Sequence, residues 1–517
     1  MIRSTFAGFT TAQLAMSASQ RALDVTGQNI ANINTQGYSK QRLDISSLNS
    51  TGSNSKIGYG VEVTGISQLR DPFLDVQYRN QMSKLGTTDA LAAGFEHLSG
   101  IFDEASMDGV RAALRDISSA LQKYSEDPNA KELDTTVRSN MQVLLNLFHD
   151  NAKRLQDVRD EMTNGFKSND VSDVNQMLQN IAELNQSIKN SQVLGNPALE
   201  LQDRRNDLID QLASYLPITV KYETEEIAPG QYLEIPNIYF TGSDGETYSL
   251  VSGTECGSLD TDISGIPVTL SITSADGNGP FDITDTISSG TLKGTLDILN
   301  ENGAFERSEV NGLGYYEKAL DTLVKTFAEK FNELNQTVKT DANGKVEYGP
   351  DGKPVMVDRP LFEKINPDED FSASNIKIAD EWLNGEYGIT ISNKIVNDEI
   401  GDSDTSNILN MINALKDSQQ FTSDGVTFFN GSFYDCFASL ENTLAIDLKS
   451  AETILKNQIS VLNQTANSRD GISGVQLDEE GMNLMHYNQS YTAAARLMTT
   501  LDEALDTLIN KTGIVGR

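Results

Sequence analysis

Three histidines and two cysteines are the side chains of this 517-residue sequence best suited to bind a metal ion or to act as nucleophiles. They are His97, His149, His486, Cys256 and Cys436. A zinc site needs such ligands at short, clustered spacings, whereas here each stands far from the others along the chain. We therefore predict no metal site, and we expect each histidine to be an ordinary core or surface residue.

Sequence motifs for phosphate binding or catalysis are also absent. We find no P-loop, no glycine-rich dinucleotide turn after a strand and no nucleophile elbow. Residues 402–407 bear a slight likeness to a calcium loop, but Asn407 stands where an EF-hand needs glycine and no glutamate occupies the twelfth position. Catalytic, cofactor-binding and metal-binding residues are thus predicted to be none, and the protein is predicted not to be an enzyme. The alternative, an enzyme, would need a reactive cluster within 218–401.

The charge balance argues against two classes of partner. The chain has 74 acidic and 40 basic residues and a formal net charge of -34, which opposes binding to nucleic acid or to an anionic membrane. No apolar run reaches the length of about 18 residues that suggests a membrane span. Residues 7–18 are interrupted by threonine, glutamine and serine where a signal peptide would be apolar. The two cysteines are too few for a disulfide framework and leave the compartment open.

The elements that remain to carry function are two heptad repeats, one at each end of the chain. The N-terminal repeat consists of Ile2, Phe9, Met16, Leu23 and Ile30 with Ala12, Ser19, Thr26 and Ile33 between them, and the C-terminal repeat of Leu484, Tyr487, Tyr491, Ala494, Met498, Leu501, Leu505 and Leu508. A single helix cannot bury such a stripe alone. We therefore predict that the two ends pair with each other and then with further copies. The assembly interface is predicted along Phe9, Met16, Leu23, Ile30, Leu484, Tyr491, Met498, Leu501, Leu505 and Leu508.

The polar surface of the N-terminal helix supports this prediction. Between Ser4 and Gln36 the only charged residues are Arg21 and Asp24, and uncharged side chains can be covered by other subunits without burying an unpaired charge. A continuous helix over 2–33 would be on the order of 48 Å long. The alternative interpretation is a flexible polar arm in which the repeat is accidental.

Between the two ends the sequence predicts a helical bundle with inserted β structure. Seams at 137–162 and 171–188 keep heptad spacing, each with one asparagine, Asn151 or Asn185, that would fix the register. Short β-type runs occur at 42–46, 61–66 and 218–273, and 243–246 are predicted to form a hairpin turn. We predict a mainly α protein with paired terminal helices, a discontinuous helical-bundle domain and a distal β-rich domain. The predicted domains are 1–66 with 474–517, 67–216 with 290–340 and 402–473, 217–289, and a small mixed region 341–401.

Both ends also carry motifs of a known family. Residues 23–38 resemble the N-terminal signature of bacterial flagellar axial proteins, and 473–480 resemble their C-terminal module. The matching positions are Asn29, Asn32, Asn34, Gly37, Tyr38, Ser473, Gly474, Leu477, Asp478 and Glu479. Gln36 in place of the usual proline and Gly481 within the last helix depart from the family pattern. Rod, hook and junction subunits share these ends, but 38–41, 181–185, 201–205, 327–335 and 468–470 resemble the subunits of the hook–filament junction.

The resemblance implies a structural subunit that forms a ring between hook and filament, outside the cell, and acts as a mechanical adaptor. Implied partners are further copies of the chain, the hook protein, a second junction protein or filament-side subunits, and an export chaperone that holds the C-terminal helix. The family also implies export through the flagellar type III channel. In the free monomer the ends are expected to be disordered and to become helical on assembly. The alternative is another axial subunit, a rod or hook protein.

Overall fold

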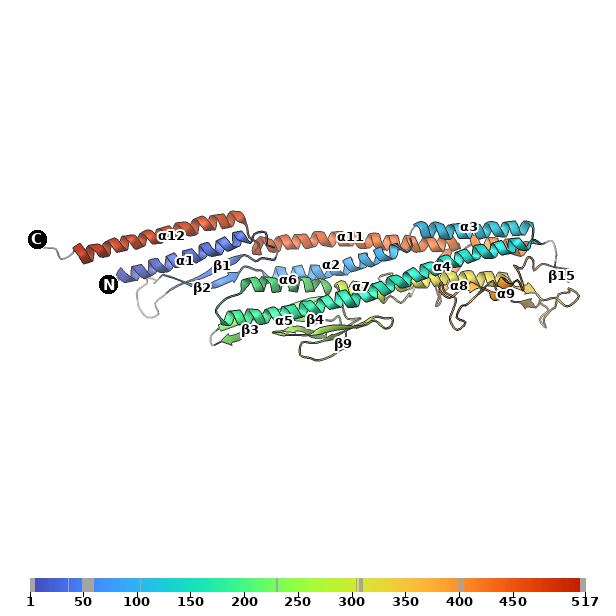
Figure 1. Cartoon of the computed structure of the whole chain (residues 1–517), viewed down its shortest axis with the longest axis horizontal. Coiled ribbons are helices and arrows are strands. Elements are labelled where there is room, and N and C mark those ends of the chain that lie inside the picture. The colour runs from blue at the N-terminus through green and yellow to red at the C-terminus, as the bar shows by residue number, and fades with distance from the viewer. Residues whose placement is uncertain are drawn as a thin grey trace, which may run out of the picture.

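The computed structural model describes residues 5–35, 37–48, 60–102, 104–228, 231–303, 305, 310–397, 399–400 and 404–511. Ile2 of the N-terminal repeat, nearly all of the loop at 50–60 and the first two residues of 402–407 lie outside this range. The molecule is a long rod with both termini at one end (Figure 1). The chain runs away from that end and returns to it, as the two matched repeats predict.

The end with both termini consists of a helix pair and a hairpin. Helix α1 (Thr5–Ala31) lies antiparallel to α12 (Leu477–Asp506), which continues into the π-helical turn η2 (Thr507–Lys511) (Figure 1). After α1 the chain forms the antiparallel pair of β1 (Gln41–Ser47) and β2 (Val61–Gln68). Helix α12 begins at Leu477 with Asp478, Glu479 and Glu480 in its first turn, where the helix dipole favours acidic groups. It continues through Gly481 without a break.

Long helices form the body of the rod. They are α2 (Pro72–Ser99), α3 (Glu104–Glu126), α4 (Lys131–Gly165), α5 (Ser172–Val193), α6 (Leu199–Tyr215), α7 (Thr291–Leu299), α8 (Leu313–Leu334), α10 (Ser406–Lys416) and α11 (Phe433–Ser473). Asp71 caps α2 through the backbone N–H of Phe73, and Pro72 opens that helix, where its missing N–H costs nothing. The π-helical turn η1 (Phe166–Val171) joins α4 to α5. The two predicted seams are buried over most of their length, and Val158 and Met162 at the end of the first are half-buried.

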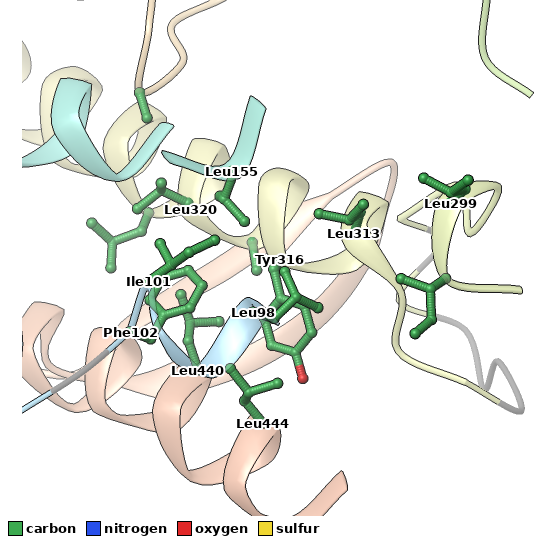
Figure 2. Packing of buried hydrophobic residues seen from close by; sticks show 14 of the residues in the cluster. Leu98, Ile101, Phe102, Leu155, Leu299, Leu313, Tyr316, Leu320, Leu440 and Leu444 are labelled. Carbon is green, nitrogen blue, oxygen red and sulfur yellow. The ribbon is translucent and has the colours of Figure 1, made fainter. Parts of the chain in front are cut away.

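One continuous hydrophobic core runs through this body. Figure 2 shows the part where α2, α8 and α11 meet, with Leu98 and Phe102 close to Tyr316 and Leu440. The ring of Phe102 lies 5.9 Å from that of Tyr316 and 5.9 Å from that of Phe437, distances typical of favourable aromatic pairs. Segments more than three hundred residues apart therefore share one core, which is why the bundle is discontinuous in sequence.

The first β region contains two antiparallel sheets. One consists of β3 (Ile218–Ala228), β4 (Gln231–Thr241), β5 (Thr247–Ser252) and β6 (Glu255–Cys256), and the other of β7 (Ser258–Asp262), β8 (Thr269–Thr273) and β9 (Phe281–Asp282). The turn predicted at 243–246 joins β4 to β5, with Gly245 at a positive φ of 88°. Both sheets lie along the flank of α5 (Figure 1), where Ile188 packs on Leu233 and Ile235. The sequence predicts a distal β-rich domain. In the structure the first β region lies beside α5, and the mixed region at 341–401 lies farthest from the termini.

The mixed region has little regular structure. It contains the helix α9 (Asp380–Asn384) and the short strands β11 (Met356–Val357), β12 (Phe362–Glu363), β13 (Lys377–Ile378), β14 (Ile395–Val396) and β15 (Glu399–Ile400). The strand β10 (Thr337–Val338), just before the region, pairs with β11. Trp382 is fully buried and its indole N–H donates to the carboxylate of Asp134 in α4. The fold class predicted from the sequence, mainly α with inserted β and paired terminal helices, is confirmed.

The helical pattern that resumes around Ser406 and is strongest at 437–462 predicts helix in this part of the chain, but β16 (Gln419–Ser423) and β17 (Val426–Gly431) form a hairpin within it. Asp424 and Gly425 form its turn, both at positive φ, which is the backbone that a two-residue hairpin loop requires. The prediction of helix across this stretch was wrong because the Asp-Gly turn signal was overlooked.

Candidate assembly interface at the terminal helices

The seam between α1 and α12 is built mainly from small side chains. Those of α1 that are buried are Ala12, Ala18, Ser19, Ala22, Val25 and Thr26, and α12 contributes the buried Ala494. Small residues let two helix backbones approach closely. At Gly8 a Cβ atom would lie only 3.0 Å from Leu501 of α12. The pairing of the two ends is therefore close, and it requires no charged group on this part of α1.

The larger residues of the predicted interface stand at the edge of this seam. Phe9, Met16, Leu23 and Ile30 of α1 and Tyr491, Met498, Leu501 and Leu505 of α12 are each half-buried. Leu484 is 41% exposed and Leu508 is 53% exposed. Since a heptad count treats large residues as the centre of a seam, it missed Ala18, Ala22 and Val25. Ala18, Ala22 and Val25 are therefore more buried than the large residues of the repeat, which stay a prediction for the assembly interface.

Asn29 organises the point where α1 ends. Its side-chain N–H₂ donates to the carbonyl of Gln41 at 2.9 Å and to Oε2 of Glu480 at 3.2 Å. Its Oδ1 accepts from the backbone N–H of Gln41 at 2.9 Å and from the hydroxyl of Tyr38 at 2.9 Å. Asn29 is only 1% exposed, and these bonds satisfy its amide in the way a buried amide requires. One motif residue thereby ties α1, β1 and α12 together.

Lys40 makes a second link between the two ends of the chain. Its Nζ lies 2.6 Å from Glu479 and 3.4 Å from Glu480, and its backbone N–H donates to the carbonyl of Ser473 at 2.8 Å. Burial would lower the pKa of Lys40, but its hydrogen bonds to the two glutamates and their charges raise it. Burial, with the charges of Asp203 and two glutamates, raises the pKa of Tyr38 to about 12. Both groups therefore keep their protons at neutral pH.

The other motif residues serve the turns at these helix ends. Asn32 donates to the carbonyl of Gln28, one turn back, and Asn34 is exposed. Gly37 has a positive φ of 78°, a backbone that glycine adopts without strain. Gly474 ends α11, and a Cβ atom there would lie 2.4 Å from the carbonyl oxygen of Asp470. Leu477 and Asp478 are exposed at the start of α12.

A cluster of charged side chains connects this end to the body, and we call it the joint. Its members are Arg70, Asp75, Tyr78, Arg79, Asp203, Asp210 and Arg469. Asp210 accepts from Arg79 at 2.7 Å and from Arg469 at 2.6 Å, while Arg70 forms a two-point pair with Asp75 at 2.9 and 3.2 Å. Apart from the resemblance of 201–205 and 468–470 to the family, no sequence pattern predicts this cluster, because charge pairs between distant helices have no spacing rule.

The joint also holds the strand that follows α1. The backbone N–H of Ser39 donates to Asp203 at 3.3 Å, and Arg469 lies over the ring of Tyr78 at 3.8 Å. Burial raises the pKa of Asp203 to about 6, although hydrogen bonds from Ser39 and the charge of Arg70 act in the opposite direction. The joint thus ties α2, α6 and the end of α11 to one another, and it reaches the terminal unit through the hydrogen bond from Ser39 to Asp203.

The described residues contain no group of histidine, cysteine and acidic side chains that could hold a metal ion. Among the described helices, none combines the length and the hydrophobicity that a membrane span requires.

Comparisons with known families match each end of the chain separately. Residues 9–38 match the family described as flagella basal body rod protein, and residues 471–511 match the one described as flagellar basal body rod FlgEFG protein C-terminal. These two matches correspond to the two helices of the terminal pair. The two matches together place the chain in the class of flagellar axial proteins.

The middle of the chain identifies the branch of this class. Residues 95–349 match the flagellar hook-associated protein FlgK helical domain. The flagellar hook-associated protein 1 of Bacillus subtilis is 28% identical over 99% of this chain and 100% of its own length, and that of Escherichia coli is 26% identical over 96% and 98%. The flagellar hook junction protein FlgK from Burkholderia pseudomallei has the same fold, with a TM-score of 0.55 and 11% identity over 77% of this chain and 100% of its own. This chain belongs to the flagellar hook-associated protein 1 family.

Proposed function

We propose that the chain is a structural subunit of the bacterial flagellum that forms the junction between hook and filament, with no enzymatic role. Membership in the hook-associated protein 1 family supports this function directly. We further propose that copies assemble through the terminal helix pair, in a unit made of 1–66 and 474–517. The observation that carries this step is the apolar surface that the pair leaves uncovered.

That surface follows the outer side of α12. Met482 and Met485 are each 60% exposed, and Leu497 is 46% exposed. With 3.6 residues per turn, these three side chains lie on one side of α12 and form an apolar row that the antiparallel partner α1 does not cover, whereas the exposed Leu484 points to the opposite side. An extended apolar row on a helix marks a surface that binds another protein. Because α1 carries almost no charge, copies can pack around both helices without burying an unpaired ion.

The interface residues that we propose for assembly are Phe9, Met16, Leu23, Ile30, Leu484, Tyr491, Met498, Leu501, Leu505 and Leu508. Half-buried residues of this set can fill grooves between neighbouring copies, and the exposed ones face outward. The motif residues around Asn29 and Lys40 set the angle between the pair and the body instead.

The joint supports a role as a mechanical adaptor. Charge-assisted hydrogen bonds are directional, so the joint holds one angle between the terminal unit and the body, whereas apolar contacts between copies are not directional. We propose that the body and its β region face the lattices of hook and filament. Proposed partners are further copies of the chain, the hook protein, a second junction protein or filament-side subunits, and an export chaperone at α12. The protein would be exported through the flagellar channel and act outside the cell.

A pair of matched substitutions tests assembly through α12. Met482→Lys/Met485→Lys places two charges on the exposed row, and Met482→Leu/Met485→Leu keeps the row apolar. Since both positions are exposed, both variants should fold as the wild type does by circular dichroism. We expect the lysine variant to leave hooks without filaments and to release flagellin into the medium, and the leucine variant to restore swimming. Full swimming of the lysine variant would contradict assembly through this surface.

Deletion of the whole gene separates the junction function from that of a rod or hook subunit. Loss of a junction subunit leaves hooks that lack filaments. Loss of a rod or hook subunit leaves no hook at all, and electron microscopy of the cells distinguishes these outcomes.

A further inference from the structure

A pocket of about 420 Å³ lies beside the joint, lined by residues of β2, the start of α2, α6 and β3. We call it the arginine pocket. Arg70, Arg79 and Arg205 line it, together with Gln202, Tyr222 and Glu234. Three arginines around one pocket are notable in a chain whose net charge is -34.

Arg205 is a buried cation with no carboxylate partner. It is 4% exposed, and its Nη1 donates to the side-chain oxygen of Asn185 at 3.0 Å. Its Nε–H has no hydrogen-bond partner among the described residues, and no described acidic group lies within ion-pair distance of it. A buried guanidinium that lacks a counter-charge is costly, so the fold retains an unfavourable group at this place.

Arg79 adds a second free donor. It is also 4% exposed, and although its Nε pairs with Asp210, its Nη2 has no partner among the described residues. Burial and the charges of Arg70 and Arg79 lower the pKa of Arg205 to about 10, with Tyr222 acting in the opposite direction. The positive charges are therefore close enough to act on one another.

The acidic groups nearby do not neutralise the pocket. Asp75 is held by Arg70, and Asp210 is shared between Arg79 and Arg469. Glu234 stands exposed at the rim and forms no ion pair with an arginine among the described residues. What remains inside is a set of N–H donors and positive charge, which suits a group that offers only acceptor oxygens.

We propose that the arginine pocket binds a small free oxyanion, a phosphate or a carboxylate, through Arg205 and the free Nη2 of Arg79. A planar guanidinium can hold two oxygens of such an anion at once. The anion would supply the missing counter-charge at the place where the terminal unit, the body and the first β region meet. This proposal is independent of the junction function, because it concerns the monomer alone.

Isothermal titration calorimetry of the full-length chain with sodium phosphate or sodium acetate, against sodium chloride at equal ionic strength, tests the proposal. We expect saturable binding of at least one oxyanion and none of chloride. Arg205→Met should weaken that binding at least about tenfold, the loss expected for charge-assisted hydrogen bonds. Arg204→Met is the matched control, because the neighbouring Arg204 is exposed and outside the pocket, and it should bind as the wild type does.

Glu234→Gln provides a second test that does not disturb a buried group. Removing the carboxylate at the rim should strengthen oxyanion binding, since Glu234 repels the ligand. The proposal is overturned if neither the wild type nor Glu234→Gln binds phosphate or acetate. It is equally overturned if Arg205→Met and Arg204→Met bind alike, or if chloride at equal ionic strength produces the same heat.

Discussion

Asp210 is the residue of the joint whose change has the most clearly defined consequence. It accepts charge-assisted hydrogen bonds from Arg79 at 2.7 Å and from Arg469 at 2.6 Å, and the side chain of Arg79 is buried. In Asp210→Asn the shape is kept but the negative charge between two arginines is lost. Breaking a buried pair in this way costs about 3 to 5 kcal/mol. Because Arg469 is partly exposed and also lies over Tyr78, we expect the lower value, about 3 kcal/mol.

Hydrogen exchange followed by mass spectrometry measures this loss where it occurs. A decrease of about 3 kcal/mol in the free energy of local opening makes amide exchange faster by about a hundredfold. We expect this faster exchange in peptides from α6 and from the last turns of α11. Asp207→Asn is the control, since Asp207 is less buried and, within the described part of the chain, accepts from Gln211, one turn away on the same helix. Equal exchange in the two variants would refute the inference that the joint depends on the Asp210 charge.

Two further predictions concern packing and pH. Gly86→Ala should destabilise the body by about 3 kcal/mol, because the new Cβ would lie 2.0 Å from the backbone oxygen of Ser214 in α6. Gly481→Ala has open space around it and should stabilise α12 by about 1 kcal/mol. Thermal unfolding of both variants checks the two signs, and a Gly86→Ala variant as stable as the wild type would contradict the contact between α2 and α6. Burial raises the pKa of Asp203 to about 6, above its unfolded value of about 4, so the folded state binds more protons between these values and stability should rise as pH falls from 7 to 5. Urea unfolding of Asp203→Asn should show a smaller rise, and the same pH dependence as in the wild type would exclude Asp203 as its source.

The parts of this fold that the sequence predicts are those with a periodic signal. The buried seams of α4 and α5 keep their spacing through Asn151 and Asn185, and both asparagines are buried as expected. Asn185 accepts from Arg205 and donates to the carbonyl of Gly253 at 2.6 Å, so it ties the seam to the β region. The two strands predicted around the loop at 50–60 also form, as β1 and β2.

The parts that the sequence does not predict depend on contacts between distant segments. The centre of the terminal seam could not be found by looking for large apolar residues, because close helix approach favours alanine, serine and glycine there. The joint had no periodic signal, because Arg79, Asp210 and Arg469 come from three separate helices. Arg205 stood within a segment that resembled the family, but only the structure shows that its charge has no acidic partner nearby.

The distribution of polar and apolar contacts explains how one chain can fit between two different lattices. The joint and the network around Asn29 consist of directional hydrogen bonds made within the chain, so the angle they set does not depend on neighbouring copies. The row around Met485 on α12 is apolar and is not covered by other parts of the chain. The free energy of an apolar contact depends on the area that it buries and has no preferred direction. A neighbour can therefore shift along this row at small cost, while the angle between pair and body stays fixed. Disruption of the joint should accordingly alter that angle, whereas disruption of the row should prevent assembly.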